Sequence, residues 1–322
     1  MDTERFLVTG AAGCIGAWVL RNLVREGTYV VAFDLDEKYH RLPLILSTEE
    51  IKRIHFLQGD ISDYSSIESA LKSCNATRLI HLAALQLPFC KADPVAGAKV
   101  NVVGTVNIFE TARQMELQHL VYASSTAVYG PSAAYPVTPL PHDARLSPQS
   151  LYGVYKQANE ATARIYFQDY GIHSIGLRPY VVYGAGRDQG MTSTPTKAIF
   201  AAAAGKGYQI TFGGSYCFQY ANDTARAFIQ AARTDFHGAD VYNLGGDSVS
   251  TQDVITAIEK AIPSSRGKLT FKDNSLPFPS SVDNSSLQSA IGRLDFTSLE
   301  DGVAETVMIF RRALKGSIIH AE

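Results

Sequence analysis

The sequence predicts an α/β fold built on a doubly wound parallel sheet, with a smaller C-terminal α+β lobe. Short β-branched runs alternate with helical spacing six times in about 180 residues, a pattern typical of parallel strands joined by right-handed crossovers. A glycine-rich turn links the first strand to the first helix. After residue 182 the alternation weakens and glycine, serine and proline become frequent, which indicates a second lobe.

The expected elements follow in chain order. Hydrophobic runs predict strands, and apolar residues three or four apart predict helices. Strands are expected at 5–10, 29–34, 55–60, 78–84, 119–124 and 173–179, then at 208–212, 240–245 and 268–271. Helices are expected at 13–27, 66–74, 100–115, 151–171, 194–205, 221–233, 250–262 and 298–314. We divide the chain into a sheet domain, 1–182, and a lobe, 183–322, from which some segments return to the sheet.

Composition excludes several classes of protein. The chain has 46% hydrophobic and 19% charged residues, a net charge of −2 and no long basic run, so nucleic acid and anionic membranes are not expected partners. The acidic N-terminus leads directly into a strand, which argues against a signal peptide. No apolar run approaches the ~20 residues of a membrane span. The cysteines lack metal-site spacing, so we expect free thiols, no metal and a cytoplasmic location: Cys14, Cys74, Cys90 and Cys217.

The stretch "VTGAAGCIG" predicts a phosphate-binding turn. Gly10, Gly13 and Gly16 lie between a strand and a helix, where a backbone without side chains can approach a pyrophosphate. Cys14 and Ile15 begin the helix, whose free amide groups favour negative charge. The spacing is not G-x-G-x-x-G, and turn geometry alone remains an alternative.

The second strand ends in Asp34, 24 residues after Gly10. A carboxylate there can accept hydrogen bonds from an adenosine ribose diol, although it can equally be a hydrated loop residue. With Asp36 and Glu37 it would repel a 2′-phosphate, and Lys38 is the only cation close in sequence. The pattern therefore favours NAD over NADP.

Two further strand ends fit a dinucleotide. "GDIS" places Asp60 and Ile61 after the third strand, where the carboxylate can reach the adenine amino group. "HLAA" ends the fourth strand with Leu82, Ala83 and Ala84, and the two small alanine side chains let a flat cofactor approach. The histidine before them, residue 81, is interpreted as a core residue because it lacks a partner at metal-ligand spacing.

A helix beginning "LYGVYK" carries a tyrosine and a lysine on one face. Side chains four apart on a helix are neighbours and adjacent ones are not, so Tyr152, rather than Tyr155, faces Lys156. A phenol with a pKa near ~10 needs a nearby ammonium to act as a base at neutral pH. Such pairs also arise by chance in helices. Upstream, "SSTAVYG" offers Ser125 and Thr126 at a strand end, where a hydroxyl can polarise a reacting oxygen or simply form a turn.

Taken in order, these motifs resemble the extended short-chain dehydrogenase/reductase family, the NAD-dependent epimerase/dehydratase group. The resemblance is carried by "TGAAGCIG", "GDIS", "HLAA", "NVVGT", "SSTAVYG", "YGVYK" and "LRPYVVYG". It implies a Rossmann-type fold, NAD as cofactor, and Ser125, Tyr152 and Lys156 as the catalytic triad. It also assigns Asn101 to a structural asparagine position at the cofactor site, and Tyr180 to the nicotinamide side of the pocket.

Departures from the family pattern bear on the substrate. Family dehydratases resemble "STDEVYG", whereas Thr126 and Ala127 follow the serine here, so elimination of water is not expected. Epimerases of nucleotide sugars usually carry an asparagine where this chain has Val181 and an arginine where it has Tyr216. Loss of a charged diphosphate contact should weaken nucleotide binding. A free sugar, sugar acid or polyol derivative is therefore favoured.

Several other side chains are candidates for substrate contacts. Arg187 follows the pocket-side strand and can clamp a carboxylate or phosphate, although a solvated loop arginine is an equal alternative. Thr192 and Ser193 can bond hydroxyl groups, and Gln86 is a similar candidate. Tyr216 can stack on a ring or simply pack in the core.

Three functions remain open from the sequence. The first is an NAD-dependent oxidoreductase that oxidises a carbohydrate-like hydroxyl and releases NADH. The second is a nucleotide-sugar 4-epimerase that recycles tightly bound NAD. The third is a non-catalytic NAD sensor, which an intact Ser–Tyr–Lys set argues against. The family resemblance also implies a homodimer formed through the helices near 95–117 and 151–170.

Overall fold

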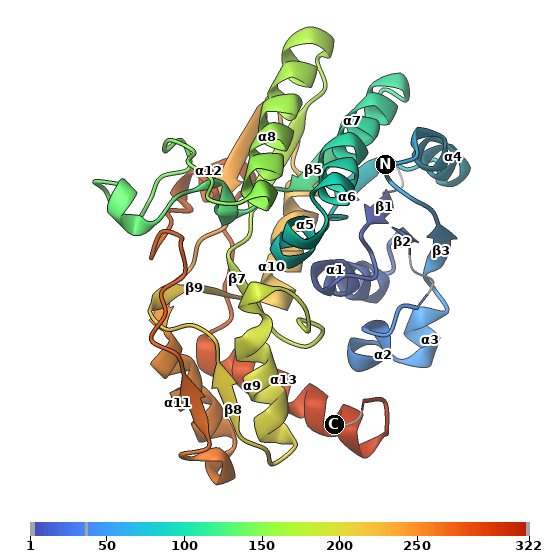
Figure 1. The fold of residues 1–322 in the computed structure, drawn as a ribbon. Coiled ribbons are helices and arrows are strands. Elements are labelled where there is room, and N and C mark those ends of the chain that lie inside the picture. Colours follow the sequence, from blue (N-terminus) through green and yellow to red (C-terminus); the bar gives the residue numbers. More distant parts are fainter. Residues whose placement is uncertain (1–3, 36–37, 320–322) are drawn as a thin grey trace.

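The computed structural model describes residues 4–35 and 38–319 and contains a seven-stranded sheet with two smaller sheets beside it (Figure 1). The strand order of the large sheet is β10-β6-β5-β4-β1-β2-β3, and every neighbouring pair is parallel. Its strands are β1 (Arg5–Thr9), β2 (Tyr29–Asp34), β3 (His55–Gln58), β4 (Arg78–His81), β5 (Leu120–Ala123), β6 (Ser174–Arg178) and β10 (Ala239–Asn243). The six strands predicted before residue 182 and the doubly wound fold are confirmed.

Helices cover both faces of this sheet, which explains why its central strands are apolar on both sides. In β1, Phe6 and Val8 belong to one core cluster and Leu7 to the other. On the Phe6 face, α1 (Cys14–Arg25) packs against α10 (Ala221–Arg233). On the opposite face lie α4 (Tyr64–Cys74), α7 (Gly104–Gln114) and α8 (Leu151–Tyr170) (Figure 1).

The second lobe contains the two small sheets and three longer helices. One sheet has the order β11-β9-β7 and the other pairs β12 with β8. The strands are β7 (Val181–Tyr183), β8 (Tyr208–Ile210), β9 (Ser215–Tyr220), β11 (Ser248–Ser250) and β12 (Leu269–Phe271). The helices are α9 (Thr194–Ala203), α11 (Thr251–Ala261) and α13 (Leu299–Lys315), all close to the predicted bounds.

Short helical segments complete the chain. Most were not predicted, since each is only one or two turns long, but residues 100–103 of the π-helix η1 (Lys99–Val103) fall within the helix expected at 100–115. The α-helical ones are α2 (Leu42–Ile45), α3 (Thr48–Ile51), α5 (Leu87–Ala92), α6 (Pro94–Ala98) and α12 (Ser285–Ile291). The others are the π-helix η1 (Lys99–Val103) and the 3-10 turns η2 (Thr126–Val128), η3 (Ser132–Ala134), η4 (Met191–Ser193) and η5 (Pro263–Ser265).

The chain returns to the sheet after residue 182. Helix α10 packs on the face that α1 covers, and β10 extends the sheet beyond β6, with Val241 opposite Gly176. The strand expected at 240–245 therefore lies in the large sheet. The division of the chain at residue 182 stays a prediction, because these two segments belong spatially with the first part.

Two general expectations can be compared with the described residues. Cys14, Cys74, Cys90 and Cys217 are all free thiols, as predicted. Within the described part of the chain, the structure contains no helix with the length and apolar character that crossing a membrane requires.

Candidate active site

A cavity of about 470 Å³ opens at the carboxyl ends of the strands, where the strand order reverses between β1 and β4. Open α/β sheets bind ligands at this switch point. Most of the predicted site residues line it, namely Gly10, Gly13, Cys14, Ile15, Gly16, Asp34, Asp60, Ile61, Leu82, Ala83, Ala84, Gln86, Ser125, Thr126, Tyr152, Lys156, Tyr180, Arg187 and Thr192. Three of them, Asn101, Ser193 and Tyr216, do not.

The glycine loop is built for close backbone approach. Gly10 has φ +69°, and a Cβ atom added to it would lie 2.5 Å from the backbone nitrogen of Ala83. A Cβ atom on Gly16 would lie 2.4 Å from the carbonyl oxygen of Gly10. The loop can therefore fold tightly against β4 and present the N-terminus of α1 to the cavity. This cradle fits the pyrophosphate of a dinucleotide.

Asp34 lies beside the same loop, at the end of β2. Its Oδ2 atom accepts a hydrogen bond from the backbone N–H of Ala12 at 2.8 Å. This contact fixes the carboxylate at the cavity edge, where it can accept a ribose hydroxyl. Asp36 and Glu37, which were expected to strengthen repulsion of a 2′-phosphate, lie outside the described residues.

A cation that was not expected from the sequence lies at this edge. Arg41 also lines the cavity, and its Nη1 atom donates to the carbonyl oxygen of Ala12 at 2.7 Å. Proximity in sequence points only to Lys38 as a cation near Asp34. The sequence does show an arginine in the connection that follows β2. Whether its side chain points into the cavity depends on how residues 38–45 fold, which the sequence pattern does not reveal.

Two polar residues named in the sequence analysis form hydrogen bonds inside the protein. His81 is buried between the hydroxyls of Thr9 and Thr105, at 2.7 and 3.2 Å, and burial lowers its pKa to about 3. It is a core histidine, as interpreted. Asn101 exchanges two 2.9 Å hydrogen bonds with the backbone of Leu85. The side chain braces the loop after β4, which fits the structural position that the resemblance implies. It does not line the cavity, and its contact with a cofactor stays a prediction.

The three catalytic candidates meet at the cavity from two elements. Ser125 caps the turn η2 after β5 and accepts a 3.1 Å hydrogen bond from the backbone N–H of Ala127, and its hydroxyl lies close enough to Tyr152 to act on the pKa of the phenol. Lys156 lies on α8 one turn after Tyr152, with its Nζ atom 5.7 Å from the centre of the tyrosine ring. That lysine is 3% exposed, and its ammonium donates to the carbonyl oxygen of Ala123 at 2.7 Å.

The neighbouring tyrosine points elsewhere. The hydroxyl of Tyr155 donates to the carbonyl oxygen of Pro94 at 2.9 Å, outside the cavity. Residues 152 and 156 share a helix face and residue 155 lies on another, which agrees with the facing argument from the sequence.

The electrostatics differ from expectation in one respect. We expect from the sequence that Lys156 lowers the pKa of Tyr152, yet that pKa is raised, because burial of the phenol outweighs the hydrogen bond from Ser125 and the charge of Arg187. Burial also lowers the pKa of Lys156 to about 8. The ammonium of Lys156 donates to the carbonyl oxygen of Ala123 and lies over the tyrosine ring.

A buried ionic network lies next to this site. Glu160, one turn after Lys156, accepts two hydrogen bonds from Arg178, at 2.8 and 2.7 Å. It also accepts a 2.5 Å hydrogen bond from Ser124, which precedes the catalytic serine candidate. Arg178 in turn donates to the Tyr129 hydroxyl at 2.5 Å. The network ties α8 to the ends of β5 and β6, which positions the candidate triad.

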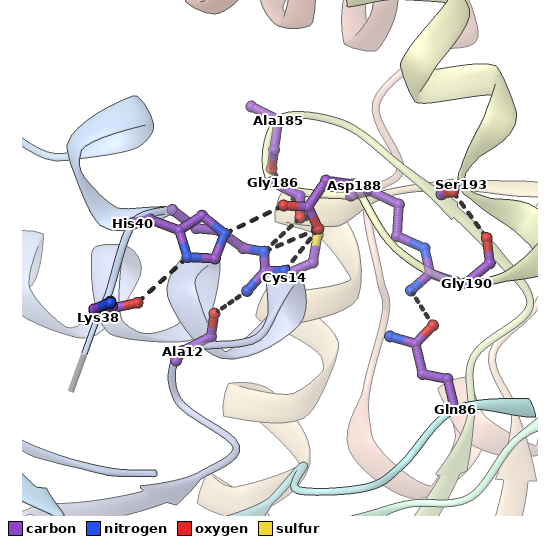
Figure 2. Close-up of polar contacts among 12 residues, drawn as sticks. Ala12, Cys14, Lys38, His40, Gln86, Ala185, Gly186, Asp188, Gly190 and Ser193 are labelled. Carbon is purple, nitrogen blue, oxygen red and sulfur yellow. Dashed lines mark hydrogen bonds and ion pairs between the residues drawn. The ribbon is translucent and has the colours of Figure 1, made fainter. Parts of the chain in front are cut away.

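A second polar cluster also lines the cavity, and Gln86, which is part of it, is labelled in Figure 2. Arg187 donates to Gln86 Oε1 at 3.4 Å and to Thr192 Oγ1 at 3.1 Å, while its Nε atom is buried without a hydrogen-bond partner among the described residues. The charge of Arg187 acts on the Tyr152 phenol. The structure thus brings together three predicted substrate contacts. Ser193 instead donates to the carbonyl oxygen of Gly190 at 2.8 Å.

The expectation that Tyr216 contacts substrate is corrected. Its side chain is 3% exposed, packs against Phe212 and Tyr180, and accepts a 2.7 Å hydrogen bond from the backbone N–H of Leu276. Val181 is fully buried in β7. The packing alternative considered from the sequence is the correct one, because β9 and the segment near residue 276 enclose the ring.

Three features together define an NAD-dependent enzyme of the extended short-chain dehydrogenase/reductase type. They are the doubly wound sheet, the glycine cradle with an acid at the end of β2, and the Ser–Tyr–Lys set at the switch point. The model of the NAD dependent epimerase/dehydratase family matches residues 6–245, and the chain belongs to that family. The residues present fit NAD as the cofactor: the cradle leaves no room for a Cβ atom, and Asp34 is fixed at the ribose end.

Comparisons with known proteins agree with this assignment. The chain is 32% identical to a UDP-glucose 4-epimerase of Mycolicibacterium smegmatis, over 95% of this chain and 98% of the relative. A UDP-glucose 4-epimerase of Thermus thermophilus, solved with NAD, superimposes with a TM-score of 0.80 at 26% identity, over 96% of this chain and all of that one. An L-threonine dehydrogenase of Clostridium difficile shares the fold, with a TM-score of 0.83 at 21% identity over 98% and 99% of the two chains.

Replacement of the cavity tyrosine tests the catalytic assignment. Tyr152→Phe is expected to lower turnover by about a thousandfold or more, because it removes the proton acceptor, and to leave NAD binding intact. Tyr155→Phe is the matched control, since it removes only the bond to Pro94. Steady-state kinetics and calorimetric NAD binding measure both effects. Equal losses in the two variants would contradict the assignment.

Burial of Lys156 predicts a pH-dependent stability. Its pKa is about 8 when folded, against an ordinary value of 10.5, so the unfolded chain binds more protons between these pH values and the free energy of unfolding rises with pH there. Below pH 8 the buried charge costs about 3 kcal/mol. Lys156→Met should therefore be more stable than the native protein at pH 7, with a gap that closes towards pH 10.5. Urea unfolding at several pH values measures the gap. Lys72→Met, which replaces an exposed lysine paired with Glu68, is the matched control. A difference for Lys156→Met that changes with pH no more than in this control would refute the argument.

Proposed function

We propose that this enzyme oxidises a hydroxyl group of a free carbohydrate-like substrate, such as a sugar, sugar acid or polyol derivative, and releases NADH. The observation that carries the proposal is the cluster of Arg187, Gln86 and Thr192 in the same cavity as the candidate triad. Its charge and hydrogen-bonding groups suit a small polyhydroxylated or carboxylated molecule.

The triad residues then have distinct tasks. NAD, when bound, supplies the acceptor for the hydride that leaves the substrate carbon. Tyr152 takes the hydroxyl proton, and Ser125 donates a hydrogen bond to the reacting oxygen as its carbonyl character develops. Lys156, held by the carbonyl oxygen of Ala123, keeps its ammonium 5.7 Å from the centre of the tyrosine ring and so places a charged group beside the proton acceptor.

Absence of the usual nucleotide contacts supports a substrate without a nucleotide. The residue at the family's arginine position is Tyr216, whose hydroxyl is already bonded to the backbone of Leu276. Val181, at the asparagine position, is fully buried. Neither side chain offers a charge-assisted contact to a diphosphate.

A nucleotide-sugar 4-epimerase that recycles its NAD is the second candidate. It is favoured by the 32% identity to the Mycolicibacterium smegmatis UDP-glucose 4-epimerase over nearly the whole length of both chains. Net formation of NADH separates the two candidates, because an epimerase reoxidises its cofactor in each turnover.

A homodimer is part of the proposal. Apolar side chains gather on the exposed surfaces of η1 and α8, including Val103, Leu151, Val154, Ile165 and Tyr170, which are 45–55% exposed. These elements belong to the regions where the family resemblance places a dimer contact. Burial of such a surface between two copies would stabilise the pair. Light scattering of the pure protein tests it: a mass near the monomer value of 35.0 kDa would contradict the dimer.

Absorbance of reduced nicotinamide tests the reaction directly. Pure protein is mixed with NAD and a panel of sugars, sugar acids, polyols and nucleotide sugars, and a steady increase with a free sugar or acid is expected. For an acidic substrate, Arg187→Gln should raise KM by about tenfold or more with a smaller effect on the KM of NAD. No NADH, with a nucleotide sugar nevertheless changing configuration by chromatography, would instead establish the epimerase.

A further inference from the structure

A buried arginine links the two lobes at the cofactor cavity. Arg41 comes from the connection between β2 and α2, and only 8% of its surface is exposed. Its Nη1 atom donates to the carbonyl oxygen of Ala12 in the glycine loop at 2.7 Å, and its Nε atom to that of Gly186 at 3.0 Å. The guanidinium therefore joins the glycine loop to the segment that follows β7 (Figure 2).

Arg41 and Asp34 flank the same residue. Ala12 donates its N–H to Asp34 at 2.8 Å and accepts from Arg41 at 2.7 Å through its carbonyl oxygen. The carboxylate of Asp34, which can bind a ribose diol, and the guanidinium of Arg41 thus contact the same residue, Ala12, and both line the cavity. In dinucleotide-binding folds, an arginine near this position accommodates the 2′-phosphate of NADP. The chain therefore carries the cation that an NADP site requires.

Asp188, from the second lobe, occupies that cation. Its Oδ1 atom accepts from Arg41 Nη2 at 2.6 Å and from Nε at 3.2 Å. The carboxylate lines the cavity as well, and its other oxygen pairs with His40 Nε2 at 3.3 Å (Figure 2). A charge-assisted pair this short largely neutralises the guanidinium. A 2′-phosphate would meet Asp34 and Asp188 together and would have to displace Asp188 from Arg41.

We propose that Asp188 is a determinant of cofactor choice: by holding Arg41 across the cavity, it denies that guanidinium to a 2′-phosphate and keeps the enzyme specific for NAD. The preference is then shared between the two lobes. Asp34, at the end of β2 in the large sheet, selects the ribose diol. Asp188, in the segment after β7, pairs with the cation that would otherwise bind a 2′-phosphate.

Calorimetric binding of NAD and of NADP to the purified protein, without substrate, tests the proposal. Asp188→Asn keeps the size of the side chain and removes its charge. It is expected to tighten NADP binding relative to NAD by about tenfold, since one charge-assisted contact becomes available to the phosphate. The double variant Asp188→Asn/Arg41→Gln should lose this gain, because the released cation is then absent.

Two single variants act as controls. Glu49→Gln removes an exposed carboxylate that pairs with Lys52 beside α3, away from the cavity, and should leave the ratio of the two dissociation constants unchanged. His40→Gln removes the other partner of Asp188 and should also leave the ratio near the native value, because Arg41 stays paired.

Three results of these measurements would each overturn the proposal. An unchanged ratio in Asp188→Asn, with a native melting temperature, would overturn the proposal. A gain that persists after Arg41→Gln would overturn it too, because the effect would then be general electrostatics. Equal weakening of NAD and NADP would also overturn it, since the pair would then only shape the cleft. If the asparagine variant melts early, Asp188→Ser removes the same charge, and the same ratio decides.

Discussion

The site depends on the contact between the glycine loop and the end of β4. No side chain fits between Gly10 and Ala83, so the two backbones lie against each other and the loop turns directly into α1. That turn leaves both polar backbone groups of Ala12 accessible, one to Asp34 and one to Arg41. The ribose end of the cavity and the link to the second lobe are therefore consequences of one close approach.

Three buried cations in or behind the cavity are compensated in different ways. Arg178 is paired with Glu160, and Arg41 with Asp188, so each of these charges has a carboxylate partner. Lys156 donates instead to the carbonyl oxygen of Ala123, and its pKa falls to about 8. A neutral dipole compensates a buried charge less fully than a carboxylate does. Protonation of the ammonium beside Tyr152 consequently responds to pH near neutrality.

Much of the fold and the candidate triad could be predicted, because periodicity and short-range spacing carry that information. The strands before residue 182 and the longer helices follow from local pattern, and the facing of Tyr152 and Lys156 follows from helix geometry. Tyr216 and Asn101 were harder. Each has a polar group that suits a ligand, and only the segments packed around them show that those groups are used inside the protein.

The doubly wound sheet, the glycine cradle and the candidate Ser–Tyr–Lys set can all be predicted from the sequence, since each depends on local patterns or on motifs that can be read in order along the chain. Tertiary structure alone decided which distant residues share the cavity. Arg41 and Asp188 are 147 positions apart, and Gln86 and Arg187 are 101 apart. No local periodicity records such pairs, because they form only when the second lobe packs beside the carboxyl ends of the strands.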